Sequence, residues 1–173
     1  VPLRVRLVKG ANLAMERTQA ERRGWPNPVL PSKVETDASY LSALDRLLTP
    51  ESINTLHLGA ASHNIYSLAT AVELAKSRGI TSGFGIEMLA GMAVPLQRVI
   101  LEDLGALRLY VPVVPRSEFD SAITYLVRRL EENAAPENFM SGAASLGRNA
   151  AFLDKEEGRF RDAVELIGSP TPA

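Results

Sequence analysis

The feature that most constrains the fold of this chain is a repeated alternation of strand patterns with helical patterns. Short segments rich in β-branched and apolar residues predict strands at 3–8, 53–60, 82–87 and 106–113. Longer helical patterns follow them, and they predict helices over 11–23, 36–48, 64–78, 92–104 and 117–133. Strands that are each followed by a helix indicate parallel βα units, because the helical crossover returns the chain to the same end of the sheet.

Loop and capping residues mark the boundaries of these elements. Segment 24–28 holds one glycine and two prolines, so we expect a loop there. Thr36 or Asp37 is predicted to cap the helix that ends near residue 48, and Ser62-His63-Asn64 to cap the next one. Gly79 stands where a helix-terminating glycine is expected.

The positions of the polar residues favour one of two architectures. Open doubly wound sheets and closed eight-stranded barrels are both built from parallel βα units. Here polar groups follow the carboxyl end of every predicted strand, at Lys9-Gly10, Ser62-His63-Asn64, Glu87 and Tyr110. In a barrel, the carboxyl ends of the strands form a rim, and the catalytic residues lie on that rim. Four units make half of an eightfold barrel, and the chain opens on a strand with no Met, so we expect a piece of a larger protein.

Composition excludes several classes of function. The chain has 173 residues, 46% of them hydrophobic and 23% charged, which is ordinary for one globular domain. A net charge of −1 gives no case for nucleic-acid binding. The absence of cysteine removes disulfides, thiolate metal sites and a Cys nucleophile. No apolar run of membrane-spanning length and no signal peptide is visible, so a cytoplasmic location is expected.

The domain organisation is expected to be one half-barrel domain over 1–140, followed by a polar segment. That segment, 141–173, reads as a tail or linker with a short helix near 154–166.

A helix face with unusual side chains lies near the end of the predicted domain. Tyr125, Arg128, Arg129 and Glu132 are spaced i, i+3, i+4 and i+7, which places them together. Two guanidiniums from neighbouring positions can clamp a carboxylate or a phosphate. The alternative is a solvated, salt-bridged surface face.

Other candidate residues each have a structural alternative. Lys9 beside Gly10 at a strand-to-helix turn fits a phosphate or cofactor contact, although the P-loop spacing is absent. His63 can equally be a local helix cap, and His57 in an apolar strand is expected to be structural. Two distant histidines without a carboxylate cluster predict no metal site. Leu89 is either core or the apolar wall beside a flat cofactor.

Six motifs in one order resemble the proline dehydrogenase family, especially the catalytic barrel of bacterial bifunctional proline utilisation proteins. They are Val5-Arg-Leu-Val-Lys-Gly-Ala11, Lys33-Val-Glu-Thr-Asp-Ala-Ser-Tyr-Leu41, Ala61-Ser-His-Asn64, Glu87-Met-Leu-Ala-Gly-Met92, Arg108-Leu-Tyr-Val-Pro-Val113 and Tyr125-Leu-Val-Arg-Arg-Leu-Glu-Glu-Asn133. The resemblance implies a distorted (β/α)8 TIM-like barrel, of which this chain is the C-terminal half, strands five to eight. It also implies FAD as cofactor and oxidation of L-proline to Δ1-pyrroline-5-carboxylate by hydride transfer.

The resemblance also implies roles for individual residues. Arg128 and Arg129 match the pair that grips the proline carboxylate, and Glu132 matches the acid that orients them. Tyr110 and Tyr125 match aromatics over the substrate ring, and Leu89 matches its apolar wall. Arg6 matches a catalytic arginine beside flavin N5. The remaining flavin-contacting positions are matched by Val8, Lys9, Gly10, Ala11, Ser62, His63 and Asn64.

Three positions depart from the family pattern, and the first half of the barrel is missing. Asn12 stands where the family commonly has an aromatic residue, Glu87 where it often has Gln, and Ser62 where it often has Thr. The implied electron acceptor is a quinone or another carrier, reached by peripheral association with the inner face of a membrane. Because the first four strands are absent, we expect this chain alone to be inactive. The alternatives are a self-associating, non-catalytic half-barrel, or an unrelated carboxylate- or phosphate-binding barrel enzyme.

Overall fold

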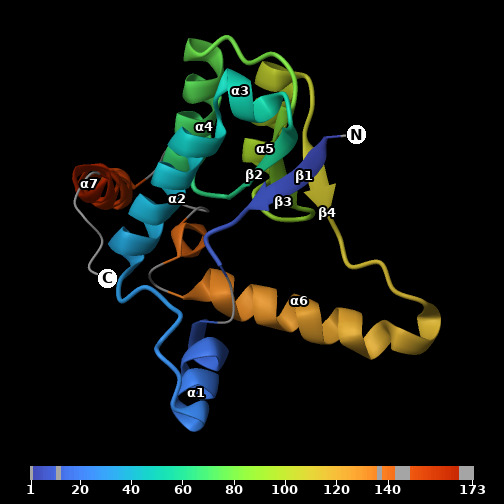
Figure 1. The fold of residues 1–173 in the computed structure, drawn as a ribbon. Coiled ribbons are helices and arrows are strands. Elements are labelled where there is room, and N and C mark those ends of the chain that lie inside the picture. Colours follow the sequence, from blue (N-terminus) through green and yellow to red (C-terminus); the bar gives the residue numbers. More distant parts are fainter. Residues whose placement is uncertain (1, 11–12, 136–137, 143–148, 168–173) are drawn as a thin grey trace.

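The computed structural model describes residues 2–10, 13–135, 138–142 and 149–167, and its centre is one parallel sheet (Figure 1). The strands are β1 (Leu3–Leu7), β2 (Leu56–Ala61), β3 (Phe84–Leu89) and β4 (Arg108–Tyr110). They lie in the order β1-β2-β3-β4, and each neighbouring pair is parallel. The predicted order and direction of the strands are therefore confirmed.

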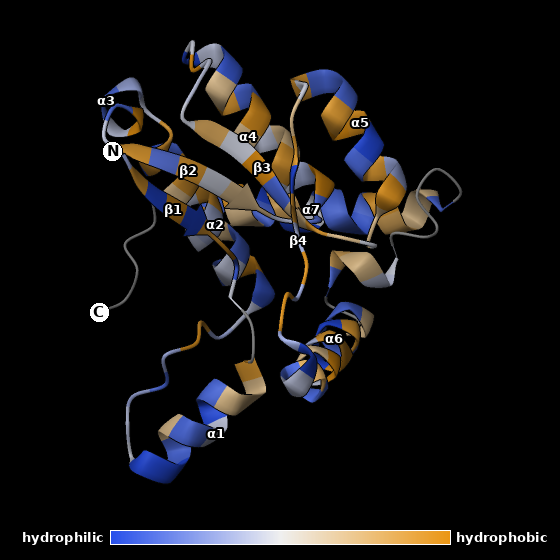
Figure 2. Cartoon of the chain, turned by 90° about the vertical axis from the view of Figure 1, so that its right-hand side faces the viewer, coloured by the Kyte–Doolittle hydropathy of each residue, from blue (hydrophilic) through white to orange (hydrophobic). Residues whose placement is uncertain are grey.

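Helices connect the strands, and some of the helices cover one face of the sheet (Figures 1 and 2). Their bounds are α1 (Leu13–Arg23), α2 (Lys33–Leu47), α3 (Pro50–Ile53), α4 (Ile65–Ser77), α5 (Val94–Leu104), α6 (Phe119–Ala134) and α7 (Ala150–Leu166), with short 3-10 turns η1 (Arg116–Glu118) and η2 (Phe139–Ser141). The core lies between the sheet and α2, α4 and α5.

Side-chain alternation gives the sheet two different faces. Leu58 and Ala60 of β2 and Ile86 of β3 are almost fully buried in the core with the helices. Residues between them point to the other side, because successive strand side chains alternate. We call this other side the open face; it is defined by Arg4, Arg6, Gly59, Glu87, Arg108 and Tyr110.

Helix α2 begins earlier than predicted. Its cap is Ser32, whose hydroxyl accepts from the Glu35 backbone N–H at 3.2 Å, while Glu35 accepts from the Ser32 backbone N–H at 2.8 Å. This reciprocal capping box satisfies two free donors at once. The prediction of a cap at Thr36 or Asp37 was therefore wrong, since both lie within the helix. The prediction for α4 is confirmed, because Asn64 accepts from the Ser67 backbone N–H at 3.1 Å.

Most strand boundaries differ from the predicted ones by one to three residues. A four-residue helix, α3, occupies the start of the second predicted strand, so β2 begins at Leu56. Strand β3 runs two residues further than predicted, to Leu89. Strand β4 ends at Tyr110 and not at residue 113, and Pro112 follows closely, which has no N–H for a sheet ladder.

The last helix is part of the packed body. It begins at Ala150, four residues before the predicted start, and it packs against α2. Ala163 is fully buried, and the ring of Phe160 stacks on Tyr66 with centroids 5.4 Å apart. The Tyr66 hydroxyl also donates to the Leu153 carbonyl at 3.2 Å. The predicted short helix of this segment is therefore present and lies against α2.

Helix α6 lies beyond the carboxyl ends of the strands instead of alongside β4 (Figure 1). Near its C-terminal end, the Asn133 side-chain amide donates to the Met92 sulfur at 2.9 Å, and Met92 follows β3. The helix thus reaches across the rim that the sequence predicted to be functional. Among the described residues, none of the helices is long and apolar enough to cross a bilayer.

Candidate functional site

A buried carboxylate organises the open face. Glu87 on β3 is 1% exposed, and its Oε1 accepts from Arg4 Nη2 at 2.8 Å. Its Oε2 lies 3.0 Å from Arg6 Nε, within ion-pair distance. That second contact is not aligned as a hydrogen bond, and Oε2 accepts none from the described residues. Glu87 therefore holds Arg4 by a directed bond and Arg6 mainly by charge.

Three of the predicted site residues, Arg6, Leu89 and Tyr110, lie near the carboxyl ends of their strands. The Arg6 guanidinium lies over the Tyr110 ring, 3.8 Å from its centroid, which is a close cation–π contact. Leu89 is paired with Tyr110 in the register of β3 and β4. Arg6, Tyr110 and Leu89 therefore lie together where β1, β3 and β4 end.

Lys9 follows β1 and is held by a carboxylate on α2. Its Nζ lies 2.5 Å from Asp37 Oδ1, and Lys33 also pairs with that carboxylate. Burial lowers the pKa of Lys9 to about 8, helped by the nearby Lys33 ammonium and opposed by Asp37. Burial works against ionisation of Asp37, yet the two ammonium groups hold its pKa below its usual value.

The 62–64 segment ties the ends of β2 and β3 together. His63 Nε2 accepts from the Leu89 backbone N–H at 3.2 Å, and the Ser62 N–H donates to the Glu87 carbonyl at 3.3 Å. Burial lowers the pKa of His63, because it disfavours the charged imidazolium. His63 is thus more than a local helix cap, the alternative left open by the sequence.

Two flavin-matched positions beside Lys9 are described and one is not. Val8 is half exposed, and Gly10 has a φ of 88°, a left-handed conformation that favours glycine. Ala11 lies outside the residues that the structure describes, as does Asn12.

Helix α6 turns its charged face inward. The two nitrogens Nη1 and Nη2 of Arg129 each lie 2.8 Å from an oxygen of Glu132, and the Arg129 guanidinium lies 5.4 Å from the Tyr125 ring centroid. The Nε atoms of Arg128 and Arg129 are buried and have no acceptor in the described part of the chain. The opposite face is apolar and exposed, at Phe119, Ile123, Val127 and Leu130.

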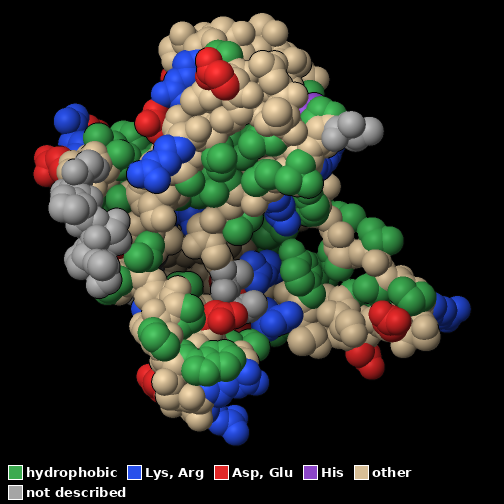
Figure 3. Space-filling model, in the orientation of Figure 1, with side chains coloured by type: hydrophobic (Ala, Val, Ile, Leu, Met, Phe, Trp, Pro, Cys, Tyr) green, Lys and Arg blue, Asp and Glu red, His purple; other side chains and the backbone are tan. Residues whose placement is uncertain are grey.

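This orientation is the reverse of a surface helix, whose apolar stripe normally faces the core. Figure 3 shows hydrophobic side chains exposed in the region of α6. Arg128 and Arg129 are therefore only partly exposed, although Arg129 is salt-bridged to Glu132 on the same helix.

The α6 pair (Arg128 and Arg129) and the open-face cluster (Arg6, Glu87 and Tyr110) are separate groups in this structure. Among the described residues, no hydrogen bond or ion pair joins Arg128 or Arg129 to Arg6, Glu87 or Tyr110. Both groups nevertheless belong to the same rim, since α6 reaches the loop after β3 through Asn133.

Sequence reasoning missed two supporting residues. Asp37 was considered only as a helix cap, although its i, i+4 spacing from Lys33 is the spacing of a helical ion pair. Arg4 was not singled out, although alternation places it on the same strand face as Arg6. Neither signal identifies the long-range partner, which comes from another element.

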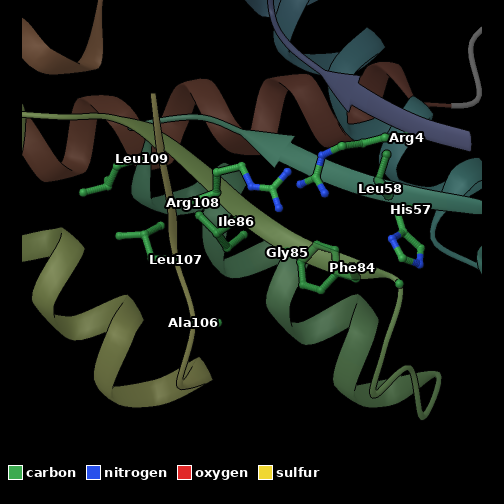
Figure 4. Close-up of a pocket in the computed structure, with 11 residues that line it drawn as sticks. Arg4, His57, Leu58, Phe84, Gly85, Ile86, Ala106, Leu107, Arg108 and Leu109 are labelled. Carbon is green, nitrogen blue, oxygen red and sulfur yellow. The ribbon is translucent and has the colours of Figure 1, made fainter. Parts of the chain in front are cut away.

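A hollow lies at the end of the open face away from the rim (Figure 4). It has a volume of about 430 Å³, and Arg4, His57, Gly85 and Arg108 are among its lining residues. The guanidiniums of Arg4 and Arg108 point toward one another across it. None of the predicted site residues lines this hollow, so we place the candidate site at the carboxyl-end rim. The described residues contain no group of three potential metal-ligating His, Asp or Glu side chains.

The comparison with known proteins supplies the family. A family model described as proline dehydrogenase matches residues 1–142. Bifunctional protein PutA of Klebsiella aerogenes is 34% identical over 178 residues, which cover 99% of this chain and 12% of that relative. Proline dehydrogenase 1, mitochondrial, of Dictyostelium discoideum is 33% identical over 136 residues, 76% of this chain and 23% of the relative.

Solved structures agree with the sequence relatives. Proline utilization A from Corynebacterium freiburgense matches with a TM-score of 0.80 and 38% identity, covering 98% of this chain and 16% of that one. The chain therefore spans only a small part of the length of these relatives. Because the family model covers most of its residues, and sequence and fold agree, the chain belongs to the proline dehydrogenase family.

Proposed function

We propose that this chain forms the C-terminal half, strands five to eight, of a barrel that oxidises L-proline to Δ1-pyrroline-5-carboxylate with FAD. The observation that carries the proposal is the inward charged face of α6, with two guanidinium Nε atoms that have no acceptor in the described part of the chain. We call the chain together with the strands that close its sheet the parent barrel.

The α6 pair is suited to a small carboxylate substrate. Arg128 and Arg129 are adjacent on the helix and diverge by about 100°, so only their long side chains can bring both guanidiniums to one carboxylate. Glu132 already holds Arg129 from one turn further along, which limits the positions that Arg129 can take. A fixed carboxylate orients the rest of the substrate over the rim.

The residues at the ends of β1 and β2 fit an anionic cofactor. Lys9 supplies a cation, and no atom lies within 4 Å of the place where a Cβ on Gly10 would stand, so a ligand can approach the backbone. Ser62, His63 and Asn64 provide further polar groups on the neighbouring strand end. When bound, FAD would accept the hydride that leaves the substrate.

The open-face cluster would form the wall beside the reacting ring. Tyr110 and Leu89 are adjacent in the register and offer aromatic and apolar surface, which excludes water. Arg6 lies over Tyr110 and brings a positive charge to that wall. We assign Arg6 to the flavin edge, Tyr110 and Tyr125 to the substrate ring, and Leu89 to its apolar side.

The chain alone is proposed to be inactive, because β1 and β4 each pair with a single strand among the described residues. The same open edges favour a second candidate, a self-associating half-barrel without catalysis. In the parent barrel the electron acceptor would be a quinone or another carrier, reached by peripheral membrane association.

Anaerobic mixing of the flavin-loaded parent barrel with L-proline tests the proposal. We expect the flavin absorbance to bleach with L-proline and to stay unchanged with D-proline. If D-proline places its carboxylate on the α6 pair, its ring cannot present the same face to the flavin. A parent barrel that binds FAD and is not bleached by proline would contradict the proposed substrate. One that binds no FAD would contradict the proposed cofactor and favour the non-catalytic alternative.

A further inference from the structure

We propose that Glu87 is a positioning residue for Arg6, and that its buried charge sets both the orientation of Arg6 and the electrostatic potential at the flavin edge. The inference rests on the proposed function, which places Arg6 beside the flavin. It explains a position where this chain departs from the commoner glutamine of its family.

The first support is the burial of Glu87 together with its two cationic partners. A carboxylate that is 1% exposed must be paired, because an isolated buried charge is strongly unfavourable. Arg4 and Arg6 are two residues apart on β1, so both point to the open face, and each faces one oxygen of Glu87. One glutamate therefore spans two arginines, and a glutamine of the same shape would leave both without a counter-charge.

The second support is a glycine that makes room for the carboxylate. Strand β2 separates Glu87 from β1, and Arg6 is in register with Gly59. A Cβ at Gly59 would stand 2.2 Å from Glu87 Oε1. The side chain of Glu87 thus crosses β2 over the one place where no side chain stands in its way.

The third support is the state of Arg6 itself. Its side chain is 38% exposed and is restrained from two strands, by Glu87 on β3 and by the Tyr110 ring on β4. The contact with Oε2 is governed by charge and not by a directed hydrogen bond. Removing the charge while keeping the shape should therefore release Arg6.

Glu87→Gln is expected to lower the rate of flavin reduction and to raise the midpoint potential of the flavin. A less restrained Arg6 slows flavin reduction by proline, which we expect to fall by about ten-fold, equivalent to about 1.4 kcal/mol. Loss of a negative charge beside two guanidiniums makes the surroundings more positive, so the electron-rich reduced flavin is favoured and the midpoint potential rises. Simple loosening of the packing would lower thermal stability without raising the potential.

The experiment compares variants of the flavin-loaded parent barrel by stopped-flow reduction and by a reductant titration of the potential. Gly59→Ala should reproduce the slower reduction, because its methyl group displaces the carboxylate. Gly85→Ala is the matched control: Gly85 pairs with Gly59 across β2 and β3, and a Cβ there meets no atom within 4 Å. Glu87→Gln added to Arg6→Ala should slow reduction no further, since Glu87 acts through Arg6.

Each outcome decides the question. Unchanged reduction and unchanged potential in Glu87→Gln would overturn the inference, and so would additive effects with Arg6→Ala. The potential is measured without proline, so it still tests Glu87 if proline fails as the substrate. A wild-type parent barrel that holds no flavin overturns both the proposed function and this inference. If Glu87→Gln does not fold, the Gly59→Ala and Gly85→Ala pair decides alone.

Discussion

Lys9 shows at the scale of one residue how burial and charge compete. Its ammonium is held near Asp37, yet its pKa of about 8 lies below that of a free lysine because burial disfavours the charge. Below pH 8 the amine is charged in both the folded and the unfolded chain, so the burial penalty is fully present. Between pH 8 and 10.5 the folded protein releases this proton first, so this group's contribution to stability becomes more favourable as pH rises.

The expected measurement is the pH dependence of unfolding in the parent barrel and in Lys9→Met. Any stability advantage of Lys9→Met should shrink between pH 8 and 10.5, by no more than about 3 kcal/mol. Lys155→Met, an exposed lysine on α7, is the control and should follow the wild-type curve. A difference that stays constant over this range would contradict the lowered pKa. Flavin retention should also weaken above pH 8, when the neutral amine no longer attracts an anion.

The α6 arginines give the second prediction at this scale. A charge-assisted bidentate contact contributes roughly 1.5–3 kcal/mol per partner, so Arg128→Met or Arg129→Met should raise the proline KM by about ten- to a hundred-fold. Flavin content should stay nearly unchanged. Lys at either position should rescue only partly, because a point charge cannot form the fork.

Steady-state kinetics with proline measure this effect in the parent barrel. Arg116→Met is the control, because Arg116 is an exposed arginine just before the same helix. A near-normal KM in both α6 variants would show that the pair does not hold the substrate.

At the scale of elements, periodicity and glycine positions predicted most of the fold. Helix ends were harder to predict, because neighbouring residues can each act as the cap. Ser32 with Glu35 forms the cap of α2 and has the Ser-x-x-Glu spacing of a capping box, but Thr36 and Asp37 are also residue types that cap helices. Helix α3 was missed because Thr49 and Pro50 look like the end of one helix, while they also begin another.

The sequence could predict only the part of the site that lies at the carboxyl ends of the parallel strands. Lys9, Ser62 to Asn64, Glu87 and Tyr110 are predicted at one rim because parallel strands bring their carboxyl ends to the same edge of the sheet. The pairing of Glu87 with Arg4 joins residues 83 positions apart, and no pattern in one sequence names such a partner. The inward face of α6 was also beyond periodicity, since both of its faces have helical spacing.

The cap of α2 carries a prediction at the element scale. Ser32→Ala removes an acceptor for a helix N–H and should lower the free energy of unfolding by about 1 kcal/mol. Ser39→Ala is the control, because Ser39 is exposed within the same helix, where alanine is the better helix former. Denaturant unfolding of the parent barrel measures both. Equal stability of the two variants would mean that the capping box contributes nothing.

At the scale of the whole molecule, the isolated chain leaves much apolar surface uncovered. The apolar face of α6 is exposed and the sheet has two open edges among the described residues. We expect the isolated chain to self-associate with rising concentration and to bind FAD poorly. Sedimentation velocity should show this, and the double change Val127→Lys with Leu130→Lys should weaken it.

The control for that measurement is Val164→Lys, at an exposed valine on α7. It should leave self-association as in the wild type. A monomer at every concentration, or tight stoichiometric binding of FAD by the isolated chain, would contradict the expectation.

The strand order has a consequence for symmetry. The two edges differ, β1 on one side and β4 on the other, so copies that continue the parallel sheet would pair head-to-tail, β4 of one with β1 of the next. Such pairing closes into a ring only if the rotation between copies allows it, and otherwise it continues as an open chain. In a twofold ring of two copies, both α6 helices would meet at one mouth, because each lies beyond the carboxyl ends of its own strands (Figure 1). A complementary half that leaves this mouth free would give one closed ring, whereas identical copies are expected to give assemblies of mixed size.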